Sequence, residues 1–278
     1  MDKKTSDIIK ITFLGTASGV APTKGYRHTS FAFEVDKRVF FFDAGESCSY
    51  TAHTMGLDLL KTEAVFISHV HIDHLGGLIN LLWTIRKLYW VHRENPLKRR
   101  LLEGKTIEVF LPKVDMEVWE AIRVVLREGG RGDNVVFNFK GRPVQDGIIF
   151  NKDNFKVIAL HNLHINKPEE ENVWRSFSYR VEYFNKIIVY SGDIRHISEL
   201  FPLLEGDARA DLLLMESGHH KVADVCNQLV LLDIKPKKLG FVHHGRAVLG
   251  NFEGELAIAK EIWGDSVFFA KDGMSIEV

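Results

Sequence analysis

The sequence predicts an α/β protein. Short segments rich in β-branched and aromatic residues, such as 8–15 and 186–193, alternate with segments such as 78–91 and 116–128, in which apolar residues recur at helical spacing. Several of the strand-like segments also stop abruptly at His or Asp. These two patterns indicate sheets covered by helices, with polar residues gathered where the strands end.

The first elements are a strand and a hairpin. Residues 8–15 alternate as a half-buried strand does and end in a turn that contains two glycines. Residues 30–36 and 38–46 are expected to form a hairpin with Lys37 at its turn. Asp43 follows a buried run of phenylalanines, where it could serve as an N-cap for the helix expected next.

A cluster of metal-binding residue types follows the next strand. Residues 64–77, AVFISHVHIDHLGG, read as an apolar strand, a polar turn and two glycines before a helix over 78–91. The candidates in the turn are His69, His71, Asp73 and His74. Neutral His nitrogens and anionic Asp oxygens are ligands that zinc favours. Because alternate residues of an extended turn point the same way, the first two can share one ion while the other two turn toward a second.

The middle of the chain, about 92–150, is expected to be an α/β insertion. It begins with a basic segment, HRENPLKRR, which we expect to be a solvated face. A strand at 107–112, a helix at 116–128 and a strand at 135–139 follow. No linker or low-complexity tract interrupts the chain, so one continuous domain over 1–278 is predicted.

The second half supplies further strands that end at candidate ligands. Residues 155–164 end at two histidines, and residues 186–193 end at Asp193. Later strand ends carry Glu216, His219, His220, His243 and His244. A helix at 255–263 and a strand at 267–278 are expected to close the chain.

Composition is typical of a globular protein, with 278 residues, 45% hydrophobic and 26% charged, and a net charge of −1. This balance gives no overall electrostatic attraction to nucleic acid or to an anionic membrane. No apolar run approaches the roughly 18 to 20 residues that span a bilayer, and no signal-peptide pattern precedes the first strand. We therefore expect a cytoplasmic protein without a membrane partner, with Cys48 and Cys226 reduced.

The H-x-H-x-D-H motif after an apolar strand resembles the signature of the metallo-β-lactamase superfamily. The turn FLGTASG is similar to the opening of ribonuclease Z and its relatives, and AKDGM near the end resembles their closing strand. The resemblance covers nearly the whole chain. It implies a four-layer αββα sandwich with metals at one edge, between the two sheets.

The resemblance also implies a role for each strand-end residue. It implies one metal held by His69, His71 and His164, a second held by Asp73, His74 and His243, and Asp193 shared by both. His161 stays an alternative to His164, and His244 an alternative to His243. Asp43 would orient the turn that carries the first four candidate ligands, residues 68–77 (the metal turn), rather than bind a metal.

The chemistry that follows is hydrolysis. All candidate ligands are N or O atoms, so two divalent cations are predicted, zinc first, with manganese or iron as alternatives. Two cations roughly 3.5 to 4 Å apart lower the pKa of a water from about 15.7 toward neutrality. Asp73 is assigned to catalysis as well as to a metal. A leaving alkoxide needs a proton, which we expect from His220, kept protonated by Glu216, with His219 as the alternative.

The spacing of the motifs predicts a small substrate. In ribonuclease Z of the short type, a long tRNA-clamping arm lies between the third His motif and the shared Asp. Here only residues 165–192 separate them, and Glu169–Glu171 within this stretch would repel a polyanion. We therefore expect a small phosphodiester, such as a cyclic nucleotide, or a nucleic-acid end, rather than a whole tRNA.

Other functions fit the same motifs. The main alternative is a hydrolase of carboxylic esters, thioesters or lactones with the same fold. A non-catalytic protein that binds metals and a ligand, and a non-hydrolytic oxidoreductase, are further alternatives. Since many members of this group are dimers, a homodimer is also an expectation.

Overall fold

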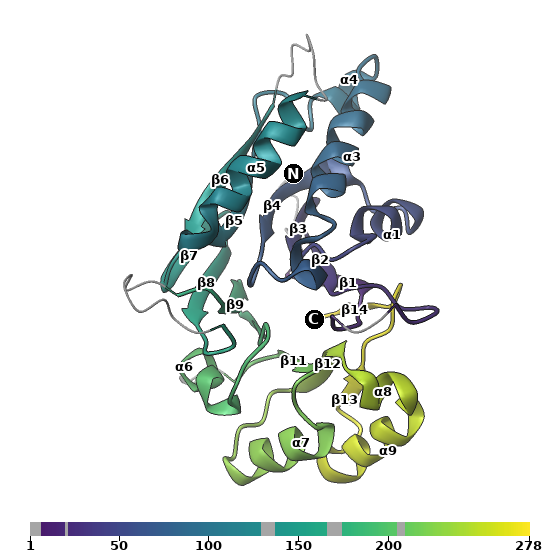
Figure 1. The fold of residues 1–278 in the computed structure, drawn as a ribbon, viewed down its shortest axis with the longest axis vertical. Helices are drawn as coiled ribbons and strands as arrows, with labels where there is room; N and C mark the ends of the chain where they lie inside the picture. Colours follow the sequence, from purple (N-terminus) through teal and green to yellow (C-terminus); the bar gives the residue numbers. More distant parts are fainter. Residues whose placement is uncertain (1–6, 20–21, 129–136, 166–173, 205–208) are drawn as a thin grey trace.

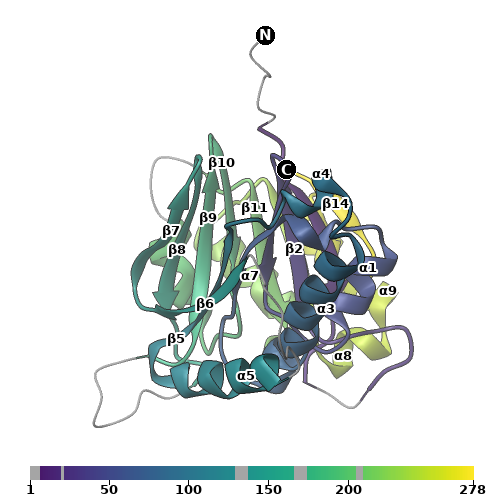
Figure 2. The same cartoon turned by 90° about the horizontal axis from the view of Figure 1, so that it is seen from above.

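Two β-sheets pack face to face, and helices cover the outer face of each (Figures 1 and 2). The computed structural model describes residues 7–19, 22–128, 137–165, 174–204 and 209–278. The layers follow one another as helix, sheet, sheet and helix, as the predicted αββα sandwich requires. The α/β fold class is therefore confirmed.

The first sheet is built mainly from the first half of the chain, with its strands in the order β14-β1-β2-β3-β4-β5-β6. Its strands are β1 (Lys10–Gly15), β2 (Ser30–Val35), β3 (Arg38–Phe42), β4 (Thr62–Phe66), β5 (Thr106–Pro112), β6 (Asn138–Val144) and β14 (Ser275–Glu277). Strands β3 to β6 run parallel. Their carboxyl ends therefore meet at one edge of the sheet.

The second sheet takes its strands in the order β13-β12-β11-β10-β9-β8-β7. They are β7 (Gly147–Lys152), β8 (Phe155–His161), β9 (Phe177–Tyr183), β10 (Lys186–Tyr190), β11 (Leu212–Ser217), β12 (Lys238–His244) and β13 (Val267–Phe269). Strands β10 to β13 run parallel. The candidate ligands of the second half lie at or just beyond the ends of β8, β10 and β12.

Helices bury their apolar faces on the outer sides of the two sheets. The α-helices are α1 (Cys48–Thr54), α2 (Ile72–Leu75), α3 (Leu78–Val91), α4 (Pro96–Arg99), α5 (Met116–Glu128), α6 (Phe201–Leu204), α7 (Val222–Leu231), α8 (Arg246–Gly250) and α9 (Phe252–Trp263). Short 3-10 turns cover Leu59–Lys61, Lys113–Asp115 and Ile197–Leu200. In α3, Leu78, Leu81, Leu82 and Ile85 are buried at the spacing of one helical face. α1, α3 and α5 cover the first sheet, and α6, α7 and α9 cover the second. None of the helices in the described part of the chain is long and apolar enough to cross a bilayer.

Aromatic rings fill the layer between the sheets. Phe40 of the first sheet stacks on Phe155 of the second with ring centroids 3.9 Å apart. Phe31 meets Tyr190 edge to face at 4.8 Å. Burying a side chain of this size stabilises the fold by about 1.5–3 kcal/mol. The sheets are thus packed closely against each other, which fixes the edge where the candidate ligands gather.

Most predicted elements are found close to their predicted bounds, and the hairpin turn is confirmed at Asp36 and Lys37, both with positive φ. The predicted strand over 267–278 is wrong, because a turn with Gly273 at φ 85° divides it into β13 and β14, which join different sheets. The basic segment after α3, expected to be a solvated face, contains the short helix α4, which Asn95 caps and in which no residue is buried.

The stretch 92–150 does not stand apart from the sheets. Its strands β5 and β6 extend the first sheet beyond β4, and β7 forms the edge of the second. The division of the chain into domains stays a prediction. Part of the strand expected at 135–139 and the acidic run 169–171 lie outside the described residues.

Candidate metal centre

The metal turn forms because the chain leaves a buried strand and bends sharply toward a helix. β4 ends at Phe66, and α2 begins just after His71, so the turn carries its polar side chains at the sheet edge. A Cβ atom on Gly77 would lie 2.2 Å from the carbonyl oxygen of Gly45, so only glycine permits this close approach. The sequence therefore fixes the turn against the end of β3.

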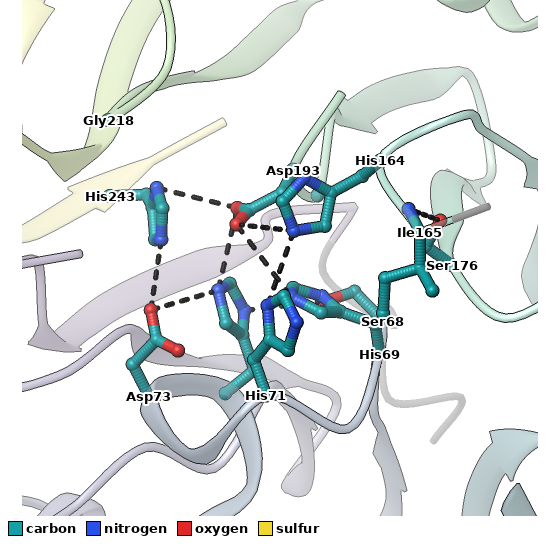
Figure 3. Close-up of polar contacts among 12 residues, drawn as sticks. Ser68, His69, His71, Asp73, His164, Ile165, Ser176, Asp193, Gly218 and His243 are labelled. Atoms are coloured by element: carbon teal, nitrogen blue, oxygen red, sulfur yellow. Dashed lines mark hydrogen bonds and ion pairs between the residues drawn. The ribbon is translucent and has the colours of Figure 1, made fainter. Parts of the chain in front are cut away.

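The first group of candidate ligands joins the metal turn to the loops after β8 and β10. His69 Nε2 lies 3.0 Å from His71 Nδ1, and His164 Nε2 lies 3.3 Å from the same Nδ1 atom. Asp193 Oδ2 is 3.7 Å from His69 Nε2 and 3.6 Å from His164 Nε2. These four side chains face one another across one small space (Figure 3).

The second group joins the metal turn to the end of β12. Asp73 Oδ2 lies 3.4 Å from His74 Nε2 and 3.1 Å from His243 Nε2. Asp193 Oδ1 is 3.4 Å from His74 Nε2 and 3.4 Å from His243 Nδ1. Asp193 therefore presents one oxygen to each group, and it lies between them (Figure 3).

The backbone at Asp193 depends on the glycine before it. Gly192 has φ 56°, and a Cβ atom there would lie 2.6 Å from the carbonyl oxygen of Phe177. A larger residue would be strained in conformation and would also collide with β9. The Ser-Gly-Asp sequence after β10 thus directs the carboxylate of Asp193 into the cluster.

The separations match what a bound cation requires. Zinc with bonds of about 2.0–2.1 Å in a tetrahedral site holds its ligand atoms ~3.3 Å apart, and the separations here run from 3.0 to 3.7 Å. Among the described residues, the buried atoms His74 Nε2, Asp193 Oδ1 and His243 Nδ1 have no hydrogen-bond partner. Buried polar atoms without partners are costly, and a cation would satisfy them. The donor set therefore fits two divalent cations, and the role of each residue as a ligand stays a prediction.

Neighbouring carboxylates raise the pKa values of the two histidines in the second group. Burial lowers the pKa of His74, but the negative charges of Asp193 and Asp43 outweigh it and raise that pKa well above its usual value. Burial likewise opposes protonation of His243, yet Asp193 and a hydrogen bond with Asp73 raise its pKa to about 9. Without a cation, these two imidazoles hold protons at neutral pH.

In the first group, by contrast, burial lowers the pKa values of two histidines. Burial lowers the pKa of His69 well below its usual value and lowers the pKa of His164 to about 4. Both imidazoles are neutral at pH 7, which is the form that binds a metal.

Asp43 orients the turn from behind. Its carboxylate accepts hydrogen bonds from the Ser68 backbone N–H at 2.7 Å and the Ser68 hydroxyl at 2.9 Å. It also lies 2.7 Å from His74 Nδ1 and accepts from the Tyr190 hydroxyl at 2.7 Å. Asp43 is completely buried and has a positive φ of 53°. Of the two roles expected for Asp43, the structure shows the contacts of the orienting one.

The structure separates the two pairs of alternative histidines. His161 Nδ1 lies 2.6 Å from Asp146 Oδ2, and its ring is outside both groups, while His164 lies within the first. His244 Nδ1 lies 3.0 Å from Ser217 Oγ, and its Nε2 donates to a backbone carbonyl, so its ring is held in the core. His243 reaches the cluster with φ 52°, a conformation that is strained for this residue type and common at functional sites.

A buried carboxylate lies next to both groups. Glu216 Oε2 accepts from the backbone N–H groups of Gly218 and His219, at 2.8 Å each. Glu216 Oε1 lies 3.0 Å from His219 Nδ1, and this hydrogen bond raises the pKa of His219. His219 Nδ1 also lies 3.8 Å from Asp193 Oδ2, and its side chain is 45% exposed.

His220 makes different contacts from those of His219. Its Nε2 donates to the carbonyl oxygen of Ile194 at 3.0 Å and lies 3.7 Å from Glu216 Oε1. Its side chain is 18% exposed, against 45% for His219. Of the two histidines, His219 is the one whose imidazole faces Asp193 and solvent together.

Comparison with known proteins gives the family. A family model described as Anti-Pycsar protein Apyc1 matches residues 9–239, a stretch that contains every candidate ligand except His243. The chain belongs to the Apyc1 family.

Curated relatives of this Apyc1-family chain include ribonuclease Z enzymes. The ribonuclease Z of Listeria welshimeri is 29% identical over 180 residues, which cover 62% of the chain and 49% of that enzyme. The ribonuclease Z of Methanothermobacter thermautotrophicus is 36% identical over 90 residues, which cover 32% of the chain and 28% of that enzyme. The chain thus spans about half the length of these relatives or less.

Solved structures share the fold over nearly the whole chain. The metallo-β-lactamase fold protein YhfI from Bacillus subtilis has a TM-score of 0.71 at 18% identity, covering 98% of this chain and 100% of that one. Human tRNase Z, short form, has a TM-score of 0.66 at 18% identity, covering 96% and 98%. Zn²⁺-bound PqqB from Methylobacterium extorquens has a TM-score of 0.64 at 15% identity, covering 97% and 100%. The predicted metallo-β-lactamase fold with ribonuclease Z-like relatives is confirmed.

Some contacts of this Apyc1-family site were not predicted. Tyr190 was read only as part of an apolar strand, yet its hydroxyl holds the carboxylate of Asp43. Ser68 was not among the predicted site residues, yet its hydroxyl joins Asp43 to the ring of His69. A polar side-chain atom on an otherwise buried strand could have indicated these contacts, because buried polar atoms need hydrogen-bond partners.

Proposed function

We propose that this Apyc1-family protein is a metal-dependent hydrolase of small phosphodiesters. It would use two divalent cations, zinc first, with manganese or iron as alternatives. The similarity to ribonuclease Z supports a hydrolase of phosphodiester bonds. Zn²⁺-bound PqqB, which shares the fold, supports the choice of metal.

The main support for this proposal is the position of Asp193 between two sets of histidines. Its Oδ2 faces His69 and His164, and its Oδ1 faces His74 and His243. A carboxylate can serve two cations, whereas a His nitrogen serves one. When bound, two cations would polarise the phosphoryl oxygens and lower the pKa of a water at the site.

The chain itself supplies a proton for the leaving group. We assign this role to His219, with His220 now the alternative. The hydrogen bond with Glu216 raises the pKa of His219 and so favours its protonated form, and the half-exposed imidazole faces the cluster. His220 Nε2 already donates its proton to the Ile194 carbonyl. General acid catalysis of this kind contributes about 10²- to 10⁴-fold in rate.

A small substrate follows from the short connection between His164 and Asp193. β9 and β10 occupy much of that connection, which leaves little chain for an arm that could hold a tRNA. A cyclic nucleotide or a nucleic-acid end therefore fits better than a whole tRNA.

The test is an assay panel on the metal-loaded protein with its metal content measured by mass spectrometry. The substrates are bis(p-nitrophenyl) phosphate, 3′,5′-cyclic AMP, p-nitrophenyl acetate and γ-butyrolactone. We expect two equivalents of metal and hydrolysis of the phosphodiesters, lost on chelation and restored by Zn²⁺ or Mn²⁺. Hydrolysis of the acetate or lactone alone would instead assign the alternative ester or lactone hydrolase.

A pair of variants controls for general damage to the protein. Asp193→Asn should remove phosphodiesterase activity and weaken the binding of both metals. Asp233→Asn, at an exposed aspartate paired with Lys235, should leave both unchanged. Equal activity in the two variants would contradict the shared role of Asp193.

A further inference from the structure

The end of β12 contains a β-bulge at the metal centre. The parallel pairing of β11 with β12 shifts by one residue, so that Glu216 pairs with Val242 but Ser217 pairs with His244. His243 is therefore the extra residue, and its backbone has φ 52°. Bulges of this kind occur next to functional sites, where they redirect a side chain. Here the bulge directs the imidazole of His243 into the cluster of candidate ligands (Figure 3).

The conformation of His243 needs support from its neighbours. A positive φ is strained for histidine and persists only where the surrounding structure holds it in place. Gly218 provides the space, because a Cβ atom there would lie 2.6 Å from His243 Nδ1. Space alone does not impose a conformation, so the bulge must be fixed by contacts on either side of it. Val242 precedes the bulge within a regularly paired strand, and His244 follows it.

The backbone of His244 is bonded to the loop after β1, which belongs to the first sheet. Its N–H donates at 2.6 Å to the carbonyl of Thr16. Its carbonyl accepts from the N–H of Ser18 at 3.1 Å and from the hydroxyl of Ser18 at 3.0 Å. The peptide groups on both sides of His244 are thus held by a loop of the opposite sheet.

The side chain of His244 is bonded within the second sheet, and it is completely buried. Its Nε2 donates at 2.8 Å to the carbonyl of Ala270, just beyond β13. Its Nδ1 lies 3.0 Å from Oγ of Ser217, the residue with which His244 pairs across the bulge. The same Oγ lies 3.3 Å from the carbonyl oxygen of Val242. The imidazole therefore holds His244 in the register that leaves His243 as the extra residue.

We infer that His244 is a positioning residue for the second metal, because its imidazole fixes the bulge that turns His243 toward the metal centre. The inference rests on the metal binding proposed above and adds a residue that does not touch a metal. Without the imidazole, β12 is free to return to the regular register, and a shift by one residue turns a side chain to the other face of its sheet. The first group takes no ligand from β12, so only the second group should change.

The test measures the affinity of each metal site in variants of the full chain. Zinc is titrated against a competing chromophoric chelator, and the visible spectrum of the Co²⁺-loaded protein reports the ligands of each ion. His244→Phe keeps a ring that can pack on Phe269, whose centroid lies 5.7 Å from that of His244, but it loses both hydrogen bonds of the imidazole. It should weaken the second zinc about 10- to 100-fold, the usual effect of losing a supporting contact, and leave the first unchanged. His244→Gln, whose amide can donate to the Ala270 carbonyl, should recover part of the loss.

Leu229→Ala is the matched control, because Leu229 of α7 is buried against the second sheet but makes none of the hydrogen bonds that fix the bulge. The cavity that it leaves should lower the melting temperature, while both zinc affinities and the cobalt spectrum stay unchanged. Equal weakening of both zinc sites in the two His244 variants would assign His244 a structural role and overturn the inference. If His244→Phe does not fold, the same comparison is made on His244→Gln, which should weaken the second zinc alone.

The unmodified protein separates this inference from the proposed function. If it binds fewer than two zinc ions, the proposed function fails, and the inference fails with it. If it binds two, and the folded His244 variants bind two with unchanged affinities, only the role of His244 is refuted.

Discussion

Asp43 Oδ2 lies 2.7 Å from His74 Nδ1, a contact between the end of β3 and the metal turn that is completely buried. The contact fixes which way the ring of His74 faces, so that its other nitrogen, Nε2, is turned toward Asp73 and Asp193. A carboxylate behind a histidine also raises its basicity as a ligand. Asp43 should therefore control metal binding without touching the metal.

Replacing Asp43 with Asn should weaken metal binding about 10- to 100-fold, the usual effect of losing such a partner. Activity should fall at limiting zinc and recover when zinc is in excess, because the proposed ligands themselves remain. Zinc titration with a competing chromophoric chelator measures the affinity. An unchanged affinity would mean that the contact of Asp43 with His74 is structural only.

Tyr190→Phe is the control for that variant. Its hydroxyl donates to the same oxygen of Asp43, but it does not contact His74 in the described structure. Burial, followed by the charge of Asp43, raises the Tyr190 pKa well above its usual value, so the phenol stays protonated and keeps donating. The variant should lose about 1–3 kcal/mol of stability and lose less metal affinity than Asp43→Asn. Chemical denaturation and the same zinc titration would show both effects.

His164 and His161 allow a paired test of the first metal. His164→Ala should remove one ligand of the first group and reduce the bound metal from two equivalents toward one. His161→Ala should keep both, because His161 contacts Asp146 and Trp174 instead of the cluster. Metal analysis after dialysis against a weak chelator measures the stoichiometry. Loss of a metal in His161→Ala, with none lost in His164→Ala, would reverse the assignment.

The sequence predicted the grouping of the candidate ligands well, because it depends on strands that end at one edge of a sandwich. His69, Asp193 and His243 were each identified as residues at or just beyond the end of an apolar strand, and all three lie in the cluster. The turn chemistry of the H-x-H-x-D-H motif is local, so its residues could be read directly from their spacing.

Choices between adjacent residues and contacts distant in sequence were harder to predict. Whether His243 or His244 enters the cluster depends on a positive φ at His243, which no local pattern signals. The contact of Tyr190 with Asp43 joins residues 147 apart in the chain, one in β10 and the other just beyond β3, and only the packing of the sandwich creates it. The choice between His219 and His220 depends in the same way on the fold of the turn after β11.

Metal binding at the second group should release protons near neutral pH. The pKa of His243 is raised to about 9 and that of His74 is raised well above its usual value, so the metal-free protein carries protons there at pH 7. A metal needs the unprotonated imidazoles. Affinity should therefore rise with pH between 7 and 9, by up to about tenfold per unit for each proton released. Calorimetry in two buffers with different ionisation enthalpies measures the protons.

The same protonation should make the metal-free protein more stable at lower pH within this range. A raised pKa in the folded state stabilises the fold fully below the unfolded pKa, near 6.5, and the contribution is lost as pH rises through about 9. The melting temperature of the metal-free protein should thus fall from pH 7 to pH 9. His164→Ala should keep this dependence, since burial already lowers the pKa of His164 to about 4. A metal-free melting temperature that rises over this interval would contradict the raised pKa of His243.

His219 and His220 make different contacts at the site, so their variants should differ in their effects on activity and stability. His219→Ala removes the imidazole whose pKa Glu216 raises and whose Nδ1 lies 3.8 Å from Asp193 Oδ2. It should lower kcat for a substrate with a poor leaving group, such as cyclic AMP, about 10²- to 10⁴-fold. Hydrolysis of bis(p-nitrophenyl) phosphate should fall much less, because p-nitrophenolate leaves readily without a proton.

His220→Ala loses its bond to the Ile194 carbonyl and should mainly lower thermal stability. Both proteins should retain their metals, as metal analysis would verify. A large, leaving-group-dependent loss in His220→Ala, with none in His219→Ala, would return the proton donor to His220.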